Sequence, residues 1–138
     1  MEDNPKKISI TCSLNIHAAH KLYRDDWSQQ KNRDVFGHCC DLHGHQYRLE
    51  VTIKGGIDPE TGMLMNGYAL EDLVKQNILT QLDHKFLNDH PFFKDRLTTV
   101  EWISVWVFDE IKKKLPSPCV LQKVKLWETP DLYAEYEN

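Results

Sequence analysis

The chain has 138 residues, of which 41% are hydrophobic and 28% are charged. This length and composition are typical of one globular domain, which we expect to span residues 1–138. The net charge of −4 argues against a general nucleic-acid-binding protein, because such proteins carry a basic surface. No apolar run reaches the roughly 20 residues of a membrane-spanning helix.

The N-terminus and the cysteines indicate a cytoplasmic protein. The first ten residues, MEDNPKKISI, lack the apolar segment of a signal peptide. The four cysteines are Cys12, Cys39, Cys40 and Cys119, and two of them are sequence neighbours, which rarely bridge. We therefore expect four reduced thiols and a cytoplasmic location.

The first half of the chain predicts two long strands. Residues 7–20 are rich in β-branched side chains, and residues 45–54 alternate apolar and polar side chains, as strands do. We expect these two strands to form an antiparallel pair. Residues 21–38 are polar and predict a long loop, which in a compact domain is often functional. After the turn GGIDPETG, we expect a short extended piece at residues 63–65.

The second half predicts two helices followed by two strands. Apolar residues fall at helical spacing in residues 68–82 and 99–115. Residues 119–128 and 132–137 predict strands, joined by a turn at residues 129–131. The order β-β-α-α-β-β favours an α+β fold, a four-stranded antiparallel sheet with both helices on one face. Oligomerisation is one way to cover the other face.

Three histidines are candidate metal ligands. His43 and His45 flank Gly44 at the start of a strand, so strand alternation points both side chains to the same side. His20, at the end of the neighbouring strand, could supply a third nitrogen, whereas His17 would face the opposite side. Three neutral imidazoles on Zn²⁺ leave a fourth position open, as in catalytic zinc sites. The alternative is a pair of surface histidines around a turn glycine.

Cys39 is a candidate base, because it lies four residues before His43. Positive charge from a nearby zinc ion favours the thiolate form of a cysteine. Two alternatives remain open: Cys39 could be the fourth ligand of a closed structural site, or a buried thiol. We interpret its neighbour Cys40 as a small packing residue.

Two carboxylates add to the candidate site, those of Asp83 and Glu128. Asp83 and His84 directly follow the first predicted helix, and a carboxylate beside an imidazole orients it for proton transfer. A histidine at a helix end also interacts favourably with the helix dipole, which is the structural alternative. Glu128 ends the third predicted strand and could accept two parallel N–H bonds from a flat, amidine-like partner, although exposed glutamates at strand ends are common.

The start of the second helix matches a capping box. Thr98 and Glu101 have the spacing S/T-x-x-E, in which each residue bonds the main chain of the other. We therefore expect a structural role for both, and Thr99 is the residue of this turn that could contact a ligand.

Four short motifs occur in a characteristic order: IHAAH (16–20), C-x-x-x-H-G-H (39–45), LDH (82–84) and WET (127–129). In this order and at these separations, the chain resembles the 6-pyruvoyl-tetrahydropterin synthase / 6-carboxy-tetrahydropterin synthase family over roughly residues 8–137. The resemblance implies the tunnelling fold (T-fold), in which the sheets of three subunits form a barrel and two trimers stack into a homohexamer with active sites at subunit interfaces.

The resemblance also implies an activity and a role for each candidate residue. The family's enzymes are zinc-dependent carbon–oxygen lyases that act on 7,8-dihydroneopterin triphosphate. By position in the motifs, the zinc ligands would be His20, His43 and His45. Cys39 would be the base, Asp83 and His84 would complete the catalytic group across an interface, and Glu128 would anchor the pterin ring.

The product depends on a spacing that differs within the family. Pyruvoyl-forming enzymes of animals usually carry five residues between the cysteine and HGH, whereas carboxy-forming enzymes of queuosine synthesis usually carry three, as here. FGHC and IDPETGMLMN are more similar to the animal type. We favour 6-carboxy-5,6,7,8-tetrahydropterin, with 6-pyruvoyl-tetrahydropterin (tetrahydrobiopterin pathway) as the alternative. A non-catalytic, zinc-stabilised pterin-binding module is the alternative of another class.

The sequence departs from the family pattern at Ile16, where phenylalanine is usual, at His17 and at Trp102. It contains no distinct triphosphate motif. The candidate cations are Lys21, Arg24, Lys31, Arg33 and Lys85.

Overall fold

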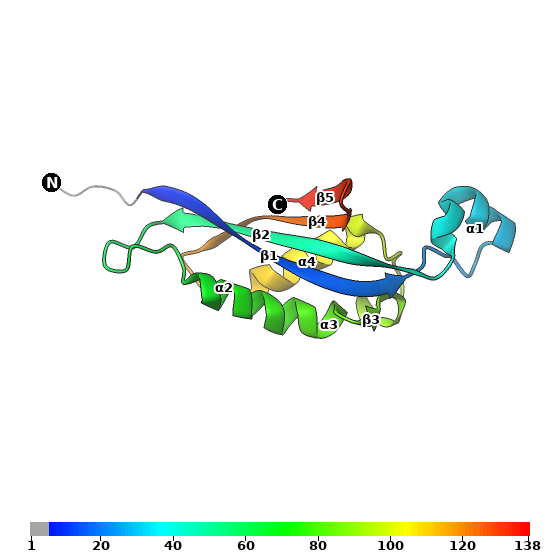
Figure 1. Ribbon diagram of the computed structural model, residues 1–138, viewed down its shortest axis with the longest axis horizontal. Coiled ribbons are helices and arrows are strands. Elements are labelled where there is room, and N and C mark those ends of the chain that lie inside the picture. Colours follow the sequence, from blue (N-terminus) through cyan, green and yellow to red (C-terminus); the bar gives the residue numbers. More distant parts are fainter. Residues whose placement is uncertain (1–5) are drawn as a thin grey trace.

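The computed structural model describes residues 6–138 and contains a five-stranded sheet with its long helices on one face (Figure 1). The strand order is β3-β1-β2-β4-β5. β1 (Lys7–His20) and β2 (His43–Gly56) pair antiparallel over their whole length, and His20 lies opposite His43. The predicted antiparallel pair is confirmed, and its register brings the two histidines together.

The remaining strands complete the sheet on both sides. β4 (Val120–Thr129) and β5 (Leu132–Tyr136) follow β2 in antiparallel order, as predicted. On the other side, β3 (Lys85–Phe86) pairs parallel with Ala18 and Ala19 of β1. The prediction of four strands missed β3, because two residues are too few to display an alternating pattern.

The two predicted helices are both present. α2 (Gly67–Val74), a π-helical turn (Lys75–Leu79) and α3 (Thr80–Leu82) follow one another without a break, where one helix over residues 68–82 was predicted. α4 (Val100–Lys114) is the second helix. Figure 1 shows α2, α3 and α4 on the same side of the sheet. They cover a face whose central side chains are all buried: Tyr47, Leu49, Val51, Ile53, Val124 and Leu126.

The segment predicted as a long loop contains a helix, so that prediction is wrong for its second half. α1 (Gln29–Phe36) is followed by a 3-10 turn (Gly37–Cys40). Ser28 caps α1 by accepting a hydrogen bond from the N–H of Lys31, and Gly37, with φ 59°, ends the helix. The helix escaped prediction because it has no apolar face, and Asn32 is its one buried residue among those described.

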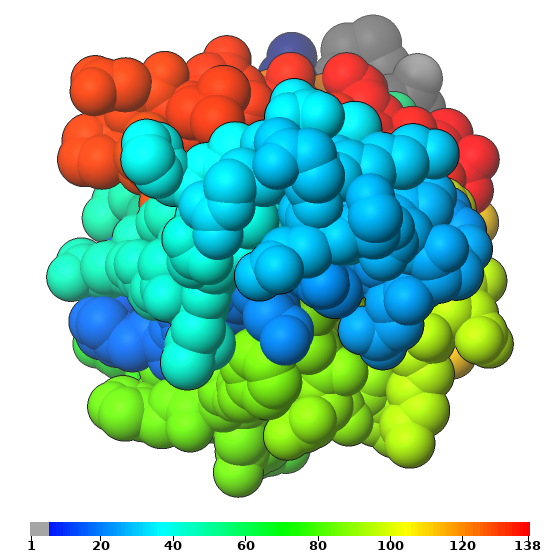
Figure 2. Space-filling model, turned by 90° about the vertical axis from the view of Figure 1, so that its right-hand side faces the viewer, coloured from blue at the N-terminus to red at the C-terminus, as the bar shows by residue number. Residues whose placement is uncertain are grey.

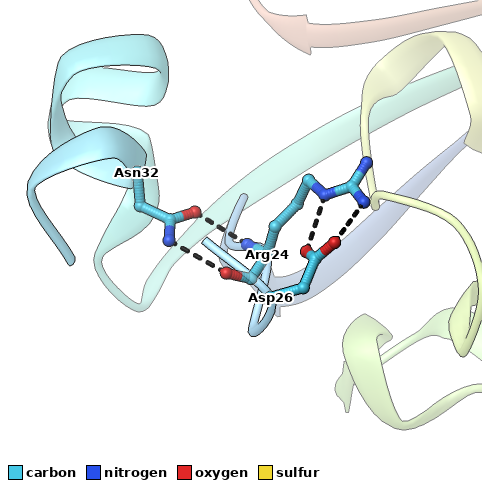
Figure 3. A network of polar contacts seen from close by, with 3 residues as sticks. All are labelled: Arg24, Asp26 and Asn32. Carbon is cyan, nitrogen blue, oxygen red and sulfur yellow. Dashed lines mark hydrogen bonds and ion pairs between the residues drawn. The ribbon is translucent and has the colours of Figure 1, made fainter. Parts of the chain in front are cut away.

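A single asparagine ties α1 to the chain that precedes it (Figure 3). The amide oxygen of Asn32 accepts from the main-chain N–H of Arg24 (2.7 Å), and its amide nitrogen donates to the Arg24 carbonyl (2.9 Å). Arg24 in turn forms two hydrogen bonds with the carboxylate of Asp26. The N–H of Leu22 then donates to the carbonyl of Cys39 (2.7 Å), so this network holds the segment that carries Cys39.

The segment after β2 forms turns instead of the extended piece predicted at residues 63–65. The N–H of Gly62 donates to the carbonyl of Asp58, and that of Asp58 donates to Met63. Two further 3-10 turns, Leu87–Asp89 and Pro91–Phe93, connect β3 to α4. Over residues 6–138, none of the helices has both the length and the apolar character needed to cross a membrane.

Candidate functional site

The candidate residues gather at one end of the molecule, where β1 ends and β2 begins. Figure 2 looks onto this end: α1 and its flanking segments lie in front, the segment around residues 80–95 lies below, and the turn between β4 and β5 lies above. Segments that are far apart in the sequence therefore meet here, which is the arrangement expected of a binding site.

His20, His43 and His45 form a compact cluster. One ring nitrogen from each lies within 4.8 Å of the others, and the ring centroids are 4.6 to 5.2 Å apart. Within residues 6–138, these three histidines make up the one group whose atoms could hold a metal ion, and Cys39 does not belong to it. The cluster therefore offers three nitrogen ligands, and the arrangement does not favour a closed site with a sulfur ligand.

Hydrogen bonds to main-chain carbonyls fix which nitrogens can bind a metal. Nδ1–H of His20 donates to the carbonyl of Thr98 (2.8 Å), and Nδ1–H of His43 donates to that of Asp41 (2.7 Å). Because a carbonyl can only accept, Nε2 of each ring keeps its lone pair. Nε2 of His45 is buried and has no hydrogen-bond partner. Nε2 of His20 and of His43 therefore suits a zinc ion, which prefers neutral imidazoles oriented by a second bond, and the unpartnered Nε2 of His45 could supply a third nitrogen.

Burial keeps His20 and His45 neutral. His20 is 1% exposed, and its burial lowers its pKa from 6.5 to about 4, partly offset by the hydrogen bond to Thr98. Burial also lowers the pKa of His45. Protons therefore compete weakly for these nitrogens near neutral pH.

Gly44 and Tyr47 lie beside the histidine cluster. A Cβ at Gly44 would lie 3.3 Å from the carbonyl oxygen of Ala18, so glycine lets the strands approach closely between the histidines. The hydroxyl of Tyr47 lies 3.3 Å from Nε2 of His20, and burial raises the pKa of the phenol. The sequence predicted Tyr47 only as a residue on the core face of a strand. Its contact with His20 was missed, because a core residue and a site residue fit the same alternating pattern.

Cys39 lies on the 3-10 turn that precedes β2 and is partly buried, whereas Cys40 is buried as a packing residue. The pKa of Tyr47 is raised mainly by burial, then by the charge of Glu128, and least by the charge of Cys39. All four cysteines are free thiols.

Asp83 and His84 lie at the outer edge of β1, where they meet His17. Nδ1 of His84 is 3.0 Å from Oδ2 of Asp83, and the N–H of His17 donates to Oδ1 (2.8 Å). The bond from His17 is the main cause that lowers the pKa of Asp83, followed by the bond from His84. The side chain of His84 is 77% exposed. Asp83 is therefore an ionised carboxylate that orients an outward-facing imidazole.

Glu128 and His45 line the same open cavity, together with Gly44, Gln46, Arg48, Trp127 and Thr129. The negative charge of Glu128 raises the pKa of His45 against the effect of burial and adds to the raised pKa of Tyr47. Glu128 thus lies beside the histidine cluster, at the border of a space open to a small molecule.

The threonines at the start of α4 have different roles from those predicted. Thr99, not Thr98, is the N-cap, and its hydroxyl accepts from the N–H of Trp102. The predicted capping box of Thr98 and Glu101 is therefore wrong by one residue. Thr98 is fully buried, its hydroxyl donates to the carbonyl of Lys21, and its own carbonyl orients His20. A main-chain carbonyl has no side-chain pattern that could predict its role, so the sequence did not predict that the carbonyl of Thr98 orients His20.

Several of the candidate cations already have partners. Arg24 is paired with Asp26, and Arg33 with Asp41 (3.0 Å). Lys31 and Lys21 lie over the rings of Trp27 and Tyr23. The position of a triphosphate group thus remains a prediction.

Comparisons with known proteins agree with this geometry. Residues 9–138 match the family model described as 6-pyruvoyl tetrahydropterin synthase. A 6-pyruvoyl tetrahydrobiopterin synthase of Pongo abelii is 40% identical over 132 residues, covering 94% of this chain and 90% of the relative. A solved structure of the 6-pyruvoyl tetrahydropterin synthase of Caenorhabditis elegans superposes with a TM-score of 0.91 at 28% identity, covering 99% of both chains. The predicted tunnelling fold is confirmed by this likeness.

A carboxy-forming relative is more distant. The 6-carboxy-5,6,7,8-tetrahydropterin synthase of Aquifex aeolicus is 27% identical over 161 aligned positions, covering 96% of this chain and 99% of the relative. Overall similarity therefore favours the pyruvoyl-forming enzymes over the product that the cysteine spacing favoured.

Proposed function

Because the chain belongs to the 6-pyruvoyl tetrahydropterin synthase family, we propose that it is a zinc-dependent lyase that converts 7,8-dihydroneopterin triphosphate to 6-pyruvoyl-tetrahydropterin. The observation that carries this proposal is the cluster of three imidazoles, in which His20 and His43 commit Nδ1 to carbonyls and His45 keeps an unpartnered, buried Nε2. A cluster of neutral donors turned inward suits a metal centre better than a set of packing residues.

The choice of product reverses our preference from the sequence. Three residues between Cys39 and His43 favour the carboxy product, whereas the 40% identical relative is a pyruvoyl-forming enzyme by name and the carboxy-forming one is 27% identical. Global similarity spans the whole pocket, including the residues around Glu128, whereas the spacing describes one turn. We therefore give the global similarity more weight than the spacing, and retain 6-carboxy-tetrahydropterin as the second candidate product.

The residues of this chain divide the chemistry between two groups. A zinc ion on His20, His43 and His45 would act as a Lewis acid that acidifies hydroxyl groups of the substrate side chain. The thiolate of Cys39, on the turn beside the cluster, removes a proton from carbon, and His84 with Asp83 transfers protons. Elimination of triphosphate accompanies an internal redox change, in which the side chain is oxidised as the pterin ring is reduced.

Glu128 and Thr99 would bind the pterin ring. The carboxylate of Glu128 lies at the border of the open cavity beside His45, and it can accept two parallel N–H bonds from the 2-amino-pyrimidine edge. The hydroxyl of Thr99 accepts the capping bond from Trp102, so its own proton remains available for a ligand acceptor.

The exposure of His84 supports an active site shared between subunits. Apart from its two-residue contact with β3, the outer edge of β1 has no strand partner among the residues that the structure describes, and β5 is the other edge of the sheet. Unpaired edges are suited to joining sheets of neighbouring subunits. We propose that three subunits close a barrel, that two trimers form a homohexamer, and that Asp83 and His84 reach the Cys39 of a neighbour. The expected cytoplasmic location is part of the same proposal.

The decisive experiment compares the zinc-loaded protein with its Cys39→Ala variant. Incubation with 7,8-dihydroneopterin triphosphate, followed by mass spectrometry, should give 6-pyruvoyl-tetrahydropterin and inorganic triphosphate for the wild type. The variant should keep its zinc and its fold and lose turnover. Unchanged substrate with the wild type, together with tight pterin binding, would instead identify a non-catalytic pterin-binding module. A carboxy product would restore the preference drawn from the spacing.

A further inference from the structure

His17 contacts both members of the Asp83–His84 pair through its main chain. Its N–H donates to Oδ1 of Asp83 (2.8 Å), and its carbonyl accepts from the N–H of His84 (2.6 Å). His84 adopts a φ of 59°, a conformation that a residue with a side chain rarely adopts without support. The main chain of β1 at His17 therefore holds the pair in place.

The imidazole of His17 shares the carboxylate with that of His84. Nδ1 of His84 lies 3.0 Å from Oδ2 of Asp83, and Nδ1 of His17 lies 3.6 Å from Oδ1. Both distances are short enough for an ion pair with a protonated imidazole, and the contact of His84 is the closer one. The two ring centroids are 5.7 Å apart. The two imidazoles thus contact different oxygens of the same carboxylate.

The surroundings of His17 leave Asp83 as the shared anion. On β2, the residue opposite His17 is the uncharged Gln46, and Arg48 follows on the same face. On β3, Lys85 pairs with Ala18 beside His17. The charged groups that neighbour His17 from these two strands are therefore cations, and the anion comes from the end of α3.

We propose that His17 is a positioning residue for the Asp83–His84 pair, which it holds through its main chain and with which it shares one carboxylate through its ring. This inference rests on the proposed function, since it assumes that His84 and Asp83 transfer protons. The N–H of His17 and Nδ1 of its ring both face Oδ1 of Asp83, which leaves Oδ2 turned towards His84.

The test uses His17→Gln in the zinc-loaded, full-length protein. Glutamine removes the ring and keeps the main-chain N–H and carbonyl, so the effect of the imidazole is isolated. His38→Gln is the matched control, because it removes an exposed imidazole from outside the pair. The readouts are kcat, KM and zinc content, together with the NMR shifts of the ring nitrogens of His84 at one fixed pH, assigned with His84→Gln.

We expect the ring-nitrogen shifts of His84 to change in His17→Gln and to match the wild type in His38→Gln, because only the first variant changes the contacts of Asp83. The value of kcat should fall by roughly threefold to tenfold in His17→Gln through misplacement of the pair, with KM and zinc content unchanged. Unchanged shifts or an unchanged kcat in His17→Gln would overturn the proposal. If the wild type turns over no substrate while the shifts still change in His17→Gln, the proposed function fails and the shared carboxylate stands.

Discussion

Two histidine clusters share β1 but differ in how complete they are within one chain. The cluster of His20, His43 and His45 faces the helices, and His20 is 1% exposed with Nδ1 bonded to a carbonyl. The cluster of His17, Asp83 and His84 lies at the edge of the same strand, and the side chain of His84 is 77% exposed. The first is preorganised for a small ion. The second presents its reactive atoms outward, as expected of a group that acts on a neighbouring subunit's pocket.

Removal of one inward ligand should produce the largest effect and break the first cluster alone. His43→Ala removes an Nε2 that the bond to Asp41 orients, and we expect zinc affinity to fall by at least about 100-fold, since loss of second-shell partners already costs 10- to 100-fold. Turnover should be lost with the metal. Zinc content after dialysis and kcat are the measurements.

The exposed His38 provides the control for this variant. His38→Ala should retain a full equivalent of zinc per chain, because its ring lies outside the cluster. Full zinc occupancy in His43→Ala would show that the three imidazoles do not form the metal centre.

The outward cluster can be broken without touching the metal. Asp83→Asn keeps the shape of the side chain and removes the charge that orients His84 across 3.0 Å. We expect kcat to fall by roughly 10² to 10⁴, the usual contribution of a general acid–base group, while zinc content stays at the wild-type level. A loss of zinc in this variant would mean that the two clusters are not independent.

Acid should lower the free energy of unfolding through the buried cluster, because His20 is held neutral in the folded chain. The folded pKa of His20, about 4, lies below the 6.5 of an unperturbed histidine. Between these values the unfolded chain binds a proton that the folded chain excludes, so stability present above pH 6.5 is lost as the pH falls towards 4. For the zinc-free protein, we expect a loss of about 2–3 kcal/mol between pH 7.5 and 4.5 from this group.

Urea unfolding of zinc-free wild type and His20→Gln at both pH values measures that loss. The variant should show a smaller difference between the two conditions, because glutamine does not titrate. Equal acid sensitivity of wild type and His20→Gln would contradict a buried, neutral imidazole.

The inward cluster was predictable from sequence, and its supports were not. Strand alternation and the strand pairing were enough to propose His20, His43 and His45 as neighbours, because apolar periodicity fixes which face is buried. The carbonyl of Thr98 and the main-chain clamp at His17 carry no side-chain signature. The helix α1 was missed because it has no apolar face, and the two-residue β3 because it is too short to alternate.

The smallest effect is expected from α1, the helix that the sequence did not predict. This prediction tests whether α1 holds Cys39 in place. Asn32→Ala removes both bonds to the main chain of Arg24 and the bond from Nδ2 to the carbonyl of Ser28 (3.0 Å). We expect a loss of about 1–3 kcal/mol from the main-chain groups left without partners. Since the N–H of Leu22 holds the carbonyl of Cys39, kcat should fall by roughly tenfold or more through misplacement of the thiol, with zinc retained. Gln30→Ala, on the same helix but bonded only to the exposed Asp34, should change neither quantity. If both variants keep wild-type kcat, α1 does not position Cys39, and the base must be held by its own turn alone.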